Sequence, residues 1–172
     1  MRLTPSYSLW VMPCGDAESK LKQIIKNLSR EYNAPYFPPH ITLISSFQGN
    51  EKNLIGNLEE LGESKIIKPF KIKFDKIAVL KETFRSVFID CEENESLIQA
   101  RNSALKLFSC KEKKYLPHAS LIYKDLKLSE KYKIISSLNN LPDQFEVNKI
   151  FLAYNNEKEF IWKVIKGVAL EA

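Results

Sequence analysis

The chain has 172 residues, of which 44% are hydrophobic and 27% are charged. These proportions are ordinary for a globular protein and exclude a disordered or low-complexity chain. No apolar stretch reaches the length of a membrane span, and the run at residues 7–12 is too short for the core of a signal peptide. We therefore expect a single domain over residues 1–172, located in the cytoplasm and without membrane contact.

The formal charge of +5 favours acidic partners, such as nucleotides and RNA ends. This is weak support, because scattered surface lysines most often serve solubility rather than binding. Cys14, Cys91 and Cys110 have no Cys-x-x-Cys spacing, so they predict neither a disulfide framework nor a zinc ribbon. We expect three buried, reduced thiols.

Helices and strands are predicted along the whole chain. Residues 7–12, which are rich in aromatic and β-branched types and end at Pro13, predict a strand. Apolar residues at helical spacing predict a helix that begins at Asp16, as its N-cap, and ends before Pro35. Strand-like residue patterns predict further strands at 40–45, 65–80, 85–91, 117–123, 144–154 and 159–170. Helical patterns of apolar residues predict further helices at 50–61, 97–108 and 129–138. With a turn at Asn155 and Asn156, this mixture predicts an α+β fold with largely antiparallel sheets.

The most informative feature is a repeated hexapeptide. Residues 39–44 read Pro-His-Ile-Thr-Leu-Ile, and residues 117–122 read Pro-His-Ala-Ser-Leu-Ile. The two histidines of these segments, His40 and His118, are the only ones in the chain. A single such motif is most often a packed or surface histidine, whereas two copies that use both histidines indicate function.

Each repeat places an imidazole and a hydroxyl together. On a strand, residues two apart share a face, so His40 lies beside Thr42 and His118 beside Ser120. Two such units facing each other suit a tetrahedral phosphate. Opening a cyclic phosphodiester needs a base for water and an acid for the departing ribose oxygen, and histidine can serve as either near neutral pH. The two hydroxyls would hold the non-bridging oxygens, and this scheme needs neither a metal nor another cofactor.

These two motifs resemble the signature of the 2H phosphoesterase superfamily, which has one His-x-[Thr/Ser] motif in each half of the chain. Residues 7–13 and the Phe-Pro-Pro-His-Ile-Thr run at 37–42 are most similar to the cyclic phosphodiesterase branch known from plants and yeast. The resemblance implies a bilobal fold of two pseudo-symmetric, intertwined lobes, each with an antiparallel sheet and helices, around a central groove. It also implies metal-free opening of 2′,3′-cyclic nucleotides or ADP-ribose 1″,2″-cyclic phosphate. The implied catalytic residues are His40, Thr42, His118 and Ser120.

Four further residues are candidates for substrate binding. The resemblance makes Tyr123 a groove residue near the phosphate, with packing at the strand end as the alternative. Trp10 and Phe84 are candidates for stacking on a nucleotide and Arg85 for a charge contact, with core or surface roles as alternatives. The expected partner is a small cyclic-phosphate nucleotide or an RNA end, bound by a monomer.

Other activities share these motifs. They include RNA 2′,3′-cyclic phosphodiesterase, cleavage of 2′,5′-linked oligonucleotides and processing of RNA 3′ ends. A binding module for cyclic phosphates or RNA ends that no longer turns over is a third alternative. Metal ligation by the two histidines is disfavoured, because neither motif places a carboxylate or cysteine beside its histidine.

Overall fold

The computed structural model describes residues 5–111 and 114–171. Its described strands are β1 (Ser6–Val11), β2 (Ile41–Phe47), β3 (Phe70–Val79), β4 (Val87–Cys91), β5 (His118–Ile122), β6 (Gln144–Val147), β7 (Lys149–Asn156) and β8 (Ile161–Ala169). Its described helices are α1 (Gly15–Glu31), α2 (Glu51–Glu63), α3 (Glu95–Leu107) and α4 (Leu128–Ser137). The predicted α+β class is confirmed.

All eight described strands belong to one antiparallel sheet, in the order β6-β3-β4-β5-β2-β1-β7-β8. The two histidine repeats form β2 and β5, which are the central pair of this order. They are joined at the partners Ile41 and Ala119. The sheet therefore brings together two segments that lie far apart in the sequence.

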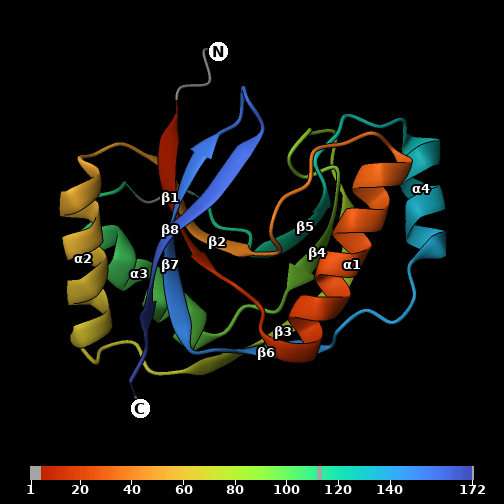
Figure 1. The fold of residues 1–172 in the computed structure, drawn as a ribbon. Coiled ribbons are helices and arrows are strands. Elements are labelled where there is room, and N and C mark those ends of the chain that lie inside the picture. Colours follow the sequence, from red (N-terminus) through yellow and green to blue (C-terminus); the bar gives the residue numbers. More distant parts are fainter. Residues whose placement is uncertain (1–4, 112–113, 172) are drawn as a thin grey trace.

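The two halves of the sheet exchange their helices. Figure 1 shows β1, β7 and β8 beside α2 and α3, and β3, β4 and β6 beside α1 and α4, with β2 and β5 between them. Helix α1 connects β1 to β2 but packs on β5, whereas α3 connects β4 to β5 and packs on β2. Each repeat is thus supported by the helix that precedes the other one, which gives the bilobal arrangement.

The apolar residues of the repeats fix the orientation of β2 and β5. Ile41, Leu43 and Ala119 belong to the core cluster beneath α2 and α3, and Leu121 belongs to the cluster beneath α1 and α4. Burying each leucine contributes about 2 kcal/mol. A slip of one residue would exchange these side chains with the polar ones, so the histidines and hydroxyls are held on the opposite face.

The start of α1 differs from the prediction. Cys14 is the N-cap, its side chain forms no capping hydrogen bond, and the predicted cap Asp16 lies in the first turn. A carboxylate there still faces the positive end of the helix dipole, which is why Asp16 suits this place without capping the helix. Gly15 has a φ of 60°, a conformation that glycine adopts readily. Cys14 is exposed and Cys110 is only partly buried, so the prediction of three buried thiols is confirmed for Cys91 alone.

The closing strands also differ from the prediction. Residues 144–154 are not one strand, because β6 pairs with β3 and β7 pairs with β1, in opposite halves of the sheet. Asn155 and Asn156 do not form the predicted turn; they pair with Trp162 and Ile161 at the end of the β7–β8 hairpin. The hairpin connection is formed by residues 157–160. Alternating burial looks the same in one strand or two, so the sequence pattern did not reveal the change of partner.

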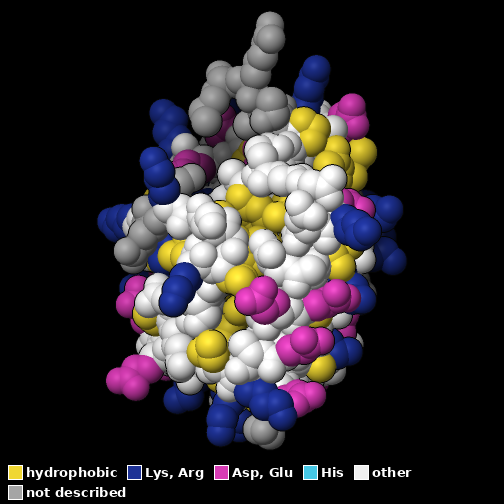
Figure 2. Space-filling view, turned by 90° about the vertical axis from the view of Figure 1, so that its left-hand side faces the viewer, with side chains coloured by type: hydrophobic (Ala, Val, Ile, Leu, Met, Phe, Trp, Pro, Cys, Tyr) yellow, Lys and Arg dark blue, Asp and Glu magenta, His cyan; other side chains and the backbone are white. Residues whose placement is uncertain are grey.

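Charged side chains are dispersed on the face that includes α2. In Figure 2, lysine and arginine side chains lie among acidic, apolar and uncharged ones on this face. The net positive charge therefore forms no continuous basic surface there. Over the described ranges, no helix has both the length and the apolar character needed to cross a bilayer.

Candidate active site

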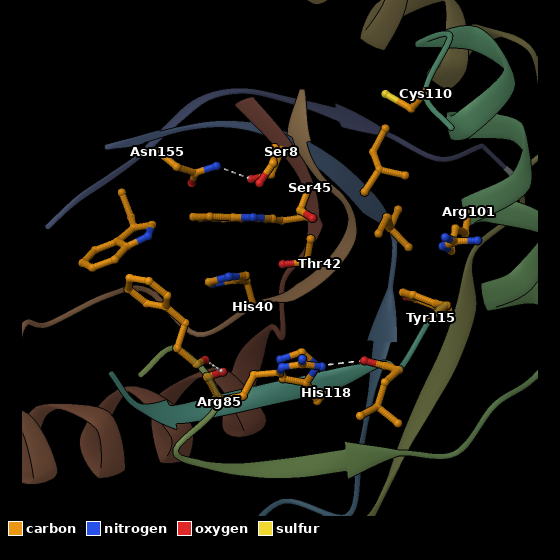
Figure 3. A pocket seen from close by; sticks show the side chains of 18 of the residues that line it. Ser8, His40, Thr42, Ser45, Arg85, Arg101, Cys110, Tyr115, His118 and Asn155 are labelled. Carbon is orange, nitrogen blue, oxygen red and sulfur yellow. Dashed lines mark hydrogen bonds between the residues drawn. The ribbon is translucent and has the colours of Figure 1, made fainter. Parts of the chain in front are cut away.

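The four repeat residues line one groove. The pairing of Ile41 with Ala119 places the polar faces of β2 and β5 together, and the side chains of His40, Thr42, His118 and Ser120 all border a cavity of about 390 Å³. Figure 3 shows both imidazoles pointing into it, with Thr42 beside His40. The juxtaposition predicted from the sequence is therefore present, and the groove has room for a small phosphate-bearing ligand.

His40 is held from two sides. Its ring stacks on Trp10 with the centroids 3.7 Å apart and the planes 13° from parallel, and its Nδ1 lies 2.7 Å from the carbonyl oxygen of Pro38. A carbonyl can only accept a hydrogen bond, so Nδ1 carries the hydrogen. The neutral ring then has its lone pair on Nε2, which makes that atom a proton acceptor.

His118 repeats this arrangement. Its Nδ1 lies 2.7 Å from the carbonyl oxygen of Leu116, two residues earlier, as Pro38 is two residues before His40. The edge of Phe88 contacts the ring, with centroids 5.2 Å apart. The same tautomer follows, so both histidines have Nε2 as the atom available for proton transfer.

The environment lowers the pKa of both histidines to different extents. Burial is the main cause at His40 and lowers its pKa from 6.5 to about 4; the Pro38 carbonyl raises it, and His118 lowers it further. Burial also lowers the pKa of His118, the Leu116 carbonyl raises it, and the charges of Arg85, Asp90 and Glu82 partly offset one another. His40 is therefore neutral at pH 7, and bound negative charge would raise both values.

The two hydroxyls are not equivalent. Ser120 Oγ donates to the carbonyl oxygen of Phe84 over 2.8 Å, so its hydrogen points away from a ligand in this conformation. Thr42 makes no side-chain hydrogen bond to any residue within 5–111 and 114–171 and lines the groove half-buried. Thr42 can donate to an anion directly, whereas Ser120 must first rotate away from Phe84.

Tyr123 lies in the groove, buried against aromatic rings. It stacks on Phe37 with centroids 3.6 Å apart and 14° between the planes, and Phe84 approaches it edge-on at 5.3 Å. Burial, which is only partly countered by the Ser120 hydroxyl, raises the pKa of Tyr123 well above its usual range. Its phenol therefore stays protonated at neutral pH.

The three remaining predicted residues all border the groove. Trp10 is 1% exposed and supports His40, so its contact in this structure is with the imidazole rather than with an open ligand site. Phe84 is half-buried at the rim. Arg85 forms two hydrogen bonds to the carboxylate of Glu82, of 2.9 and 3.0 Å, which offset much of its charge.

Several groove residues were not predicted from the sequence. One end of the groove carries Arg101, Lys111, Lys114 and Tyr115, and the guanidinium of Arg101 lies 4.6 Å from the centroid of the Tyr115 ring. Figure 3 shows Arg101 and Tyr115 to the right of the histidines, and Asn155, next to Ser8, above them. The basic residues gave no separate signal in the sequence, because Arg101 lies in an ordinary amphipathic helix and Lys111 and Lys114 belong to a lysine-rich stretch after it.

The other end of the groove is formed mainly by the β7–β8 hairpin. It includes Trp162 and Glu157, together with Asn155, whose amide donates to Ser8 Oγ over 2.7 Å. The predicted turn at Asn155 and Asn156 left Glu157 in a connection, and nothing linked Trp162, in the following predicted strand, to the histidine motifs. Within the described part of the chain, no three His, Cys, Asp or Glu side chains gather as ligands for one metal ion.

Known proteins resemble this chain over nearly its whole length. A family model described as cyclic phosphodiesterase-like protein matches residues 5–170. A cyclic phosphodiesterase of Arabidopsis thaliana is 25% identical over 172 residues, covering 95% of this chain and 93% of that protein. The structure of E. coli LigT complexed with 3′-AMP has a TM-score of 0.64 at 11% identity, covering 98% of this chain and 99% of LigT. TT0787 of Thermus thermophilus has a TM-score of 0.63 at 15% identity, over 97% and 98% of the two chains. These two structures show that the fold is shared.

Replacing His40 with phenylalanine should make folding less sensitive to acid. The unfolded chain binds a proton at this site below its ordinary pKa of 6.5, whereas the folded chain does so only near 4. The contribution of His40 to the free energy of unfolding is therefore constant above about pH 6.5. It falls by about 3 kcal/mol as the pH drops toward 4. His40→Phe keeps a ring against Trp10 but cannot titrate. Urea unfolding at pH 7 and pH 4 should show the smaller loss in the variant; equal losses would contradict the buried, neutral His40.

Proposed function

The chain belongs to the family of cyclic phosphodiesterase-like proteins, and on that premise we propose that it opens the cyclic phosphodiester of a nucleotide with His40 and His118 as the proton-transfer pair. The family membership confirms the resemblance to 2H phosphoesterases and makes the chain a phosphoester hydrolase. One observation carries the proposal. The Nε2 atoms of two neutral imidazoles face a single groove from neighbouring strands.

The unequal burial assigns the two roles. A pair works best when the base has the lower pKa and the acid the higher, because the required protonation state is then the most populated one. His40 has a pKa near 4 and is therefore the base, and His118 is the acid. The negative charge of the bound phosphodiester raises the pKa of His118 and favours its protonated form.

Hydrolysis then proceeds as an in-line displacement. His40 Nε2 takes a proton from water as the water oxygen bonds to phosphorus. The bond from phosphorus to one ribose oxygen breaks on the opposite side, and that oxygen receives a proton from His118 Nε2. The Thr42 hydroxyl donates to a non-bridging oxygen, and Ser120 does so after leaving the Phe84 carbonyl, where negative charge accumulates. The chain supplies all of these groups without a metal ion.

Removing either imidazole should abolish most of the turnover. Proton transfer by a positioned side chain contributes about 10²- to 10⁴-fold to the rate, so His40→Ala and His118→Ala should lose at least about 100-fold in kcat. Hydrolysis of adenosine 2′,3′-cyclic phosphate measures this, with chelator present throughout and circular dichroism to establish folding. Near-native turnover by a folded His118→Ala variant would refute the paired mechanism. Loss of wild-type activity in the presence of chelator would refute the proposal that the reaction needs no metal.

The dependence of kcat/KM on pH should be bell-shaped with an acidic optimum. The ascending limb reports deprotonation of His40, near pH 4, and the descending limb reports His118, below 6.5. The substrate anion raises both pKa values, so the optimum of kcat should lie at a higher pH than that of kcat/KM. Steady-state kinetics from pH 3.5 to 9 measure both profiles. An optimum of kcat/KM above pH 7 would contradict the role assignment.

The basic end of the groove favours an RNA end as a second candidate substrate. Arg101, Lys111 and Lys114 line the same groove as the histidines. Figure 3 shows Arg101 well away from Asn155, which precedes Glu157 by two residues. Arg101 is buried and lies over the Tyr115 ring, which keeps its guanidinium at the groove wall. A nucleotide that carries a further phosphate on its 5′ oxygen would place that charge among these cations.

A 5′-phosphate should therefore improve the substrate. We expect adenosine 2′,3′-cyclic phosphate 5′-phosphate to exceed the unphosphorylated nucleotide in kcat/KM by about 10-fold at low salt. Lys111→Gln with Lys114→Gln should remove most of this ratio, whereas Lys158→Gln on the β7–β8 connection should keep it. Equal rates for the two substrates would favour the cyclic mononucleotide as the substrate class.

A further inference from the structure

We propose that the end of the groove beneath the β7–β8 hairpin is a nucleobase-reading subsite, in which Trp162 stacks on the base and Glu157 accepts its N–H groups, so that guanine is preferred. The inference rests on the proposed function, because it specifies which nucleotides the same groove takes. It concerns two residues outside the histidine repeats, and both border the groove.

The ring of Trp162 is positioned for stacking. It is half-buried and lies 5.1 Å from Tyr123 and 6.4 Å from Phe84, measured between centroids, at angles of 53° and 71°. Its other ring contacts, to Phe37 and Phe160, are also tilted or edge-on. By contrast, Trp10 and Tyr123 each stack on a ring that lies within 14° of parallel. Among the described residues, no ring covers a face of Trp162 in this way, which leaves it free for a planar base.

Glu157 supplies the second observation. Its carboxylate is half-buried at the groove, and residues 5–111 and 114–171 provide it with no ion pair and no hydrogen bond. Burial raises the pKa of Glu157, and the charge of Glu157 raises the pKa of Tyr123, in keeping with the place of both residues in the lining of the groove. A partly desolvated carboxylate at a groove for phosphate gains stability when it accepts hydrogen bonds, and we assign the donors to the ligand.

The hairpin brings the ring and the carboxylate together. Asn155 on β7 pairs with Trp162 on β8, and Glu157 follows Asn155 by two residues, at the start of the connection 157–160. All three border the groove, and the bond from the Asn155 amide to Ser8 Oγ ties this end of the hairpin to β1. The ring and the acceptor therefore have fixed places on the same wall.

A carboxylate distinguishes the four bases by their donors. Guanine presents a ring N–H and an amino group side by side, which match the two oxygens of Glu157. Adenine and cytosine each present one amino group beside a ring nitrogen that only accepts. Uracil presents one N–H between two carbonyls, which repel the carboxylate. The expected order of preference is guanine first, adenine and cytosine next, and uracil last.

The test compares the four nucleoside 2′,3′-cyclic phosphates. Wild-type kcat/KM should be at least about 10-fold higher for guanosine than for uridine. Glu157→Gln should bring this ratio close to one, because glutamine offers one donor and one acceptor. The matched control Glu159→Gln, on the exposed part of the same connection, should keep the wild-type ratio. Trp162→Ala should lower kcat/KM for all four bases, and Trp162→Phe should restore part of the loss.

Two outcomes would overturn the inference: equal rates on the four nucleotides, or a guanine preference that persists in Glu157→Gln. Failure to hydrolyse any cyclic nucleotide would instead refute the proposed function. The subsite is then tested by calorimetry with guanosine and uridine 3′-monophosphates. Tighter binding of guanosine that is lost in Glu157→Gln supports the subsite, and equal or absent binding of the two overturns it.

Discussion

The antiparallel contact between β2 and β5 is the constraint on which the site depends. It pairs Ile41 with Ala119 and thereby sets His40 and His118 across one groove. The contact is short, and its stability comes from the helices behind it, because α1 packs on β5 and α3 packs on β2. The exchange of helices ties the position of each histidine to the packing of both halves. A shift of either half relative to the other would change the separation of the two imidazoles, so the intertwined fold is well suited to two-sided proton transfer.

In the groove the two imidazoles are held in place, whereas the Ser120 hydroxyl must rotate before it can donate to a ligand. Both imidazoles are anchored at Nδ1 by backbone carbonyls, and His40 is stacked on Trp10, so little side-chain freedom remains for these rings to lose on binding. Burial lowers the pKa of His40, which costs stability in acid and keeps the ring neutral at pH 7. The Ser120 hydroxyl differs from the imidazoles, because it donates its hydrogen to the carbonyl oxygen of Phe84. Redirecting this hydrogen to a ligand costs little free energy, because a hydroxyl rotates without moving the backbone.

The repeated motif made the fold class and the central residues predictable. Two hexapeptides around the only histidines, each with alternating polar and apolar residues, determine which side chains share a face. The end of the groove at Trp162 and Glu157 could not be predicted in the same way, because it depends on where the β7–β8 hairpin turns. Asn155 favours turns by propensity, but pairing with Trp162 keeps it in the strand. The hydrogen bond from Ser120 to Phe84 could not be predicted either, because it joins residues that are far apart in the sequence and meet only in the folded structure.

The charges along the groove have opposite signs at its two ends. Glu157 lies at the aromatic end and Arg101, Lys111 and Lys114 lie at the other, while Arg85 is offset by Glu82. A nucleotide has a matching arrangement, with hydrogen-bond donors on its base and negative charge on its phosphates. Electrostatics alone therefore favours one orientation, with the base toward Glu157 and any further phosphate toward the cations. For the proposed cyclic-phosphate substrate, this orientation would place the phosphate between the histidines, so that the two ends of the groove would set its direction and the centre would supply the proton transfers.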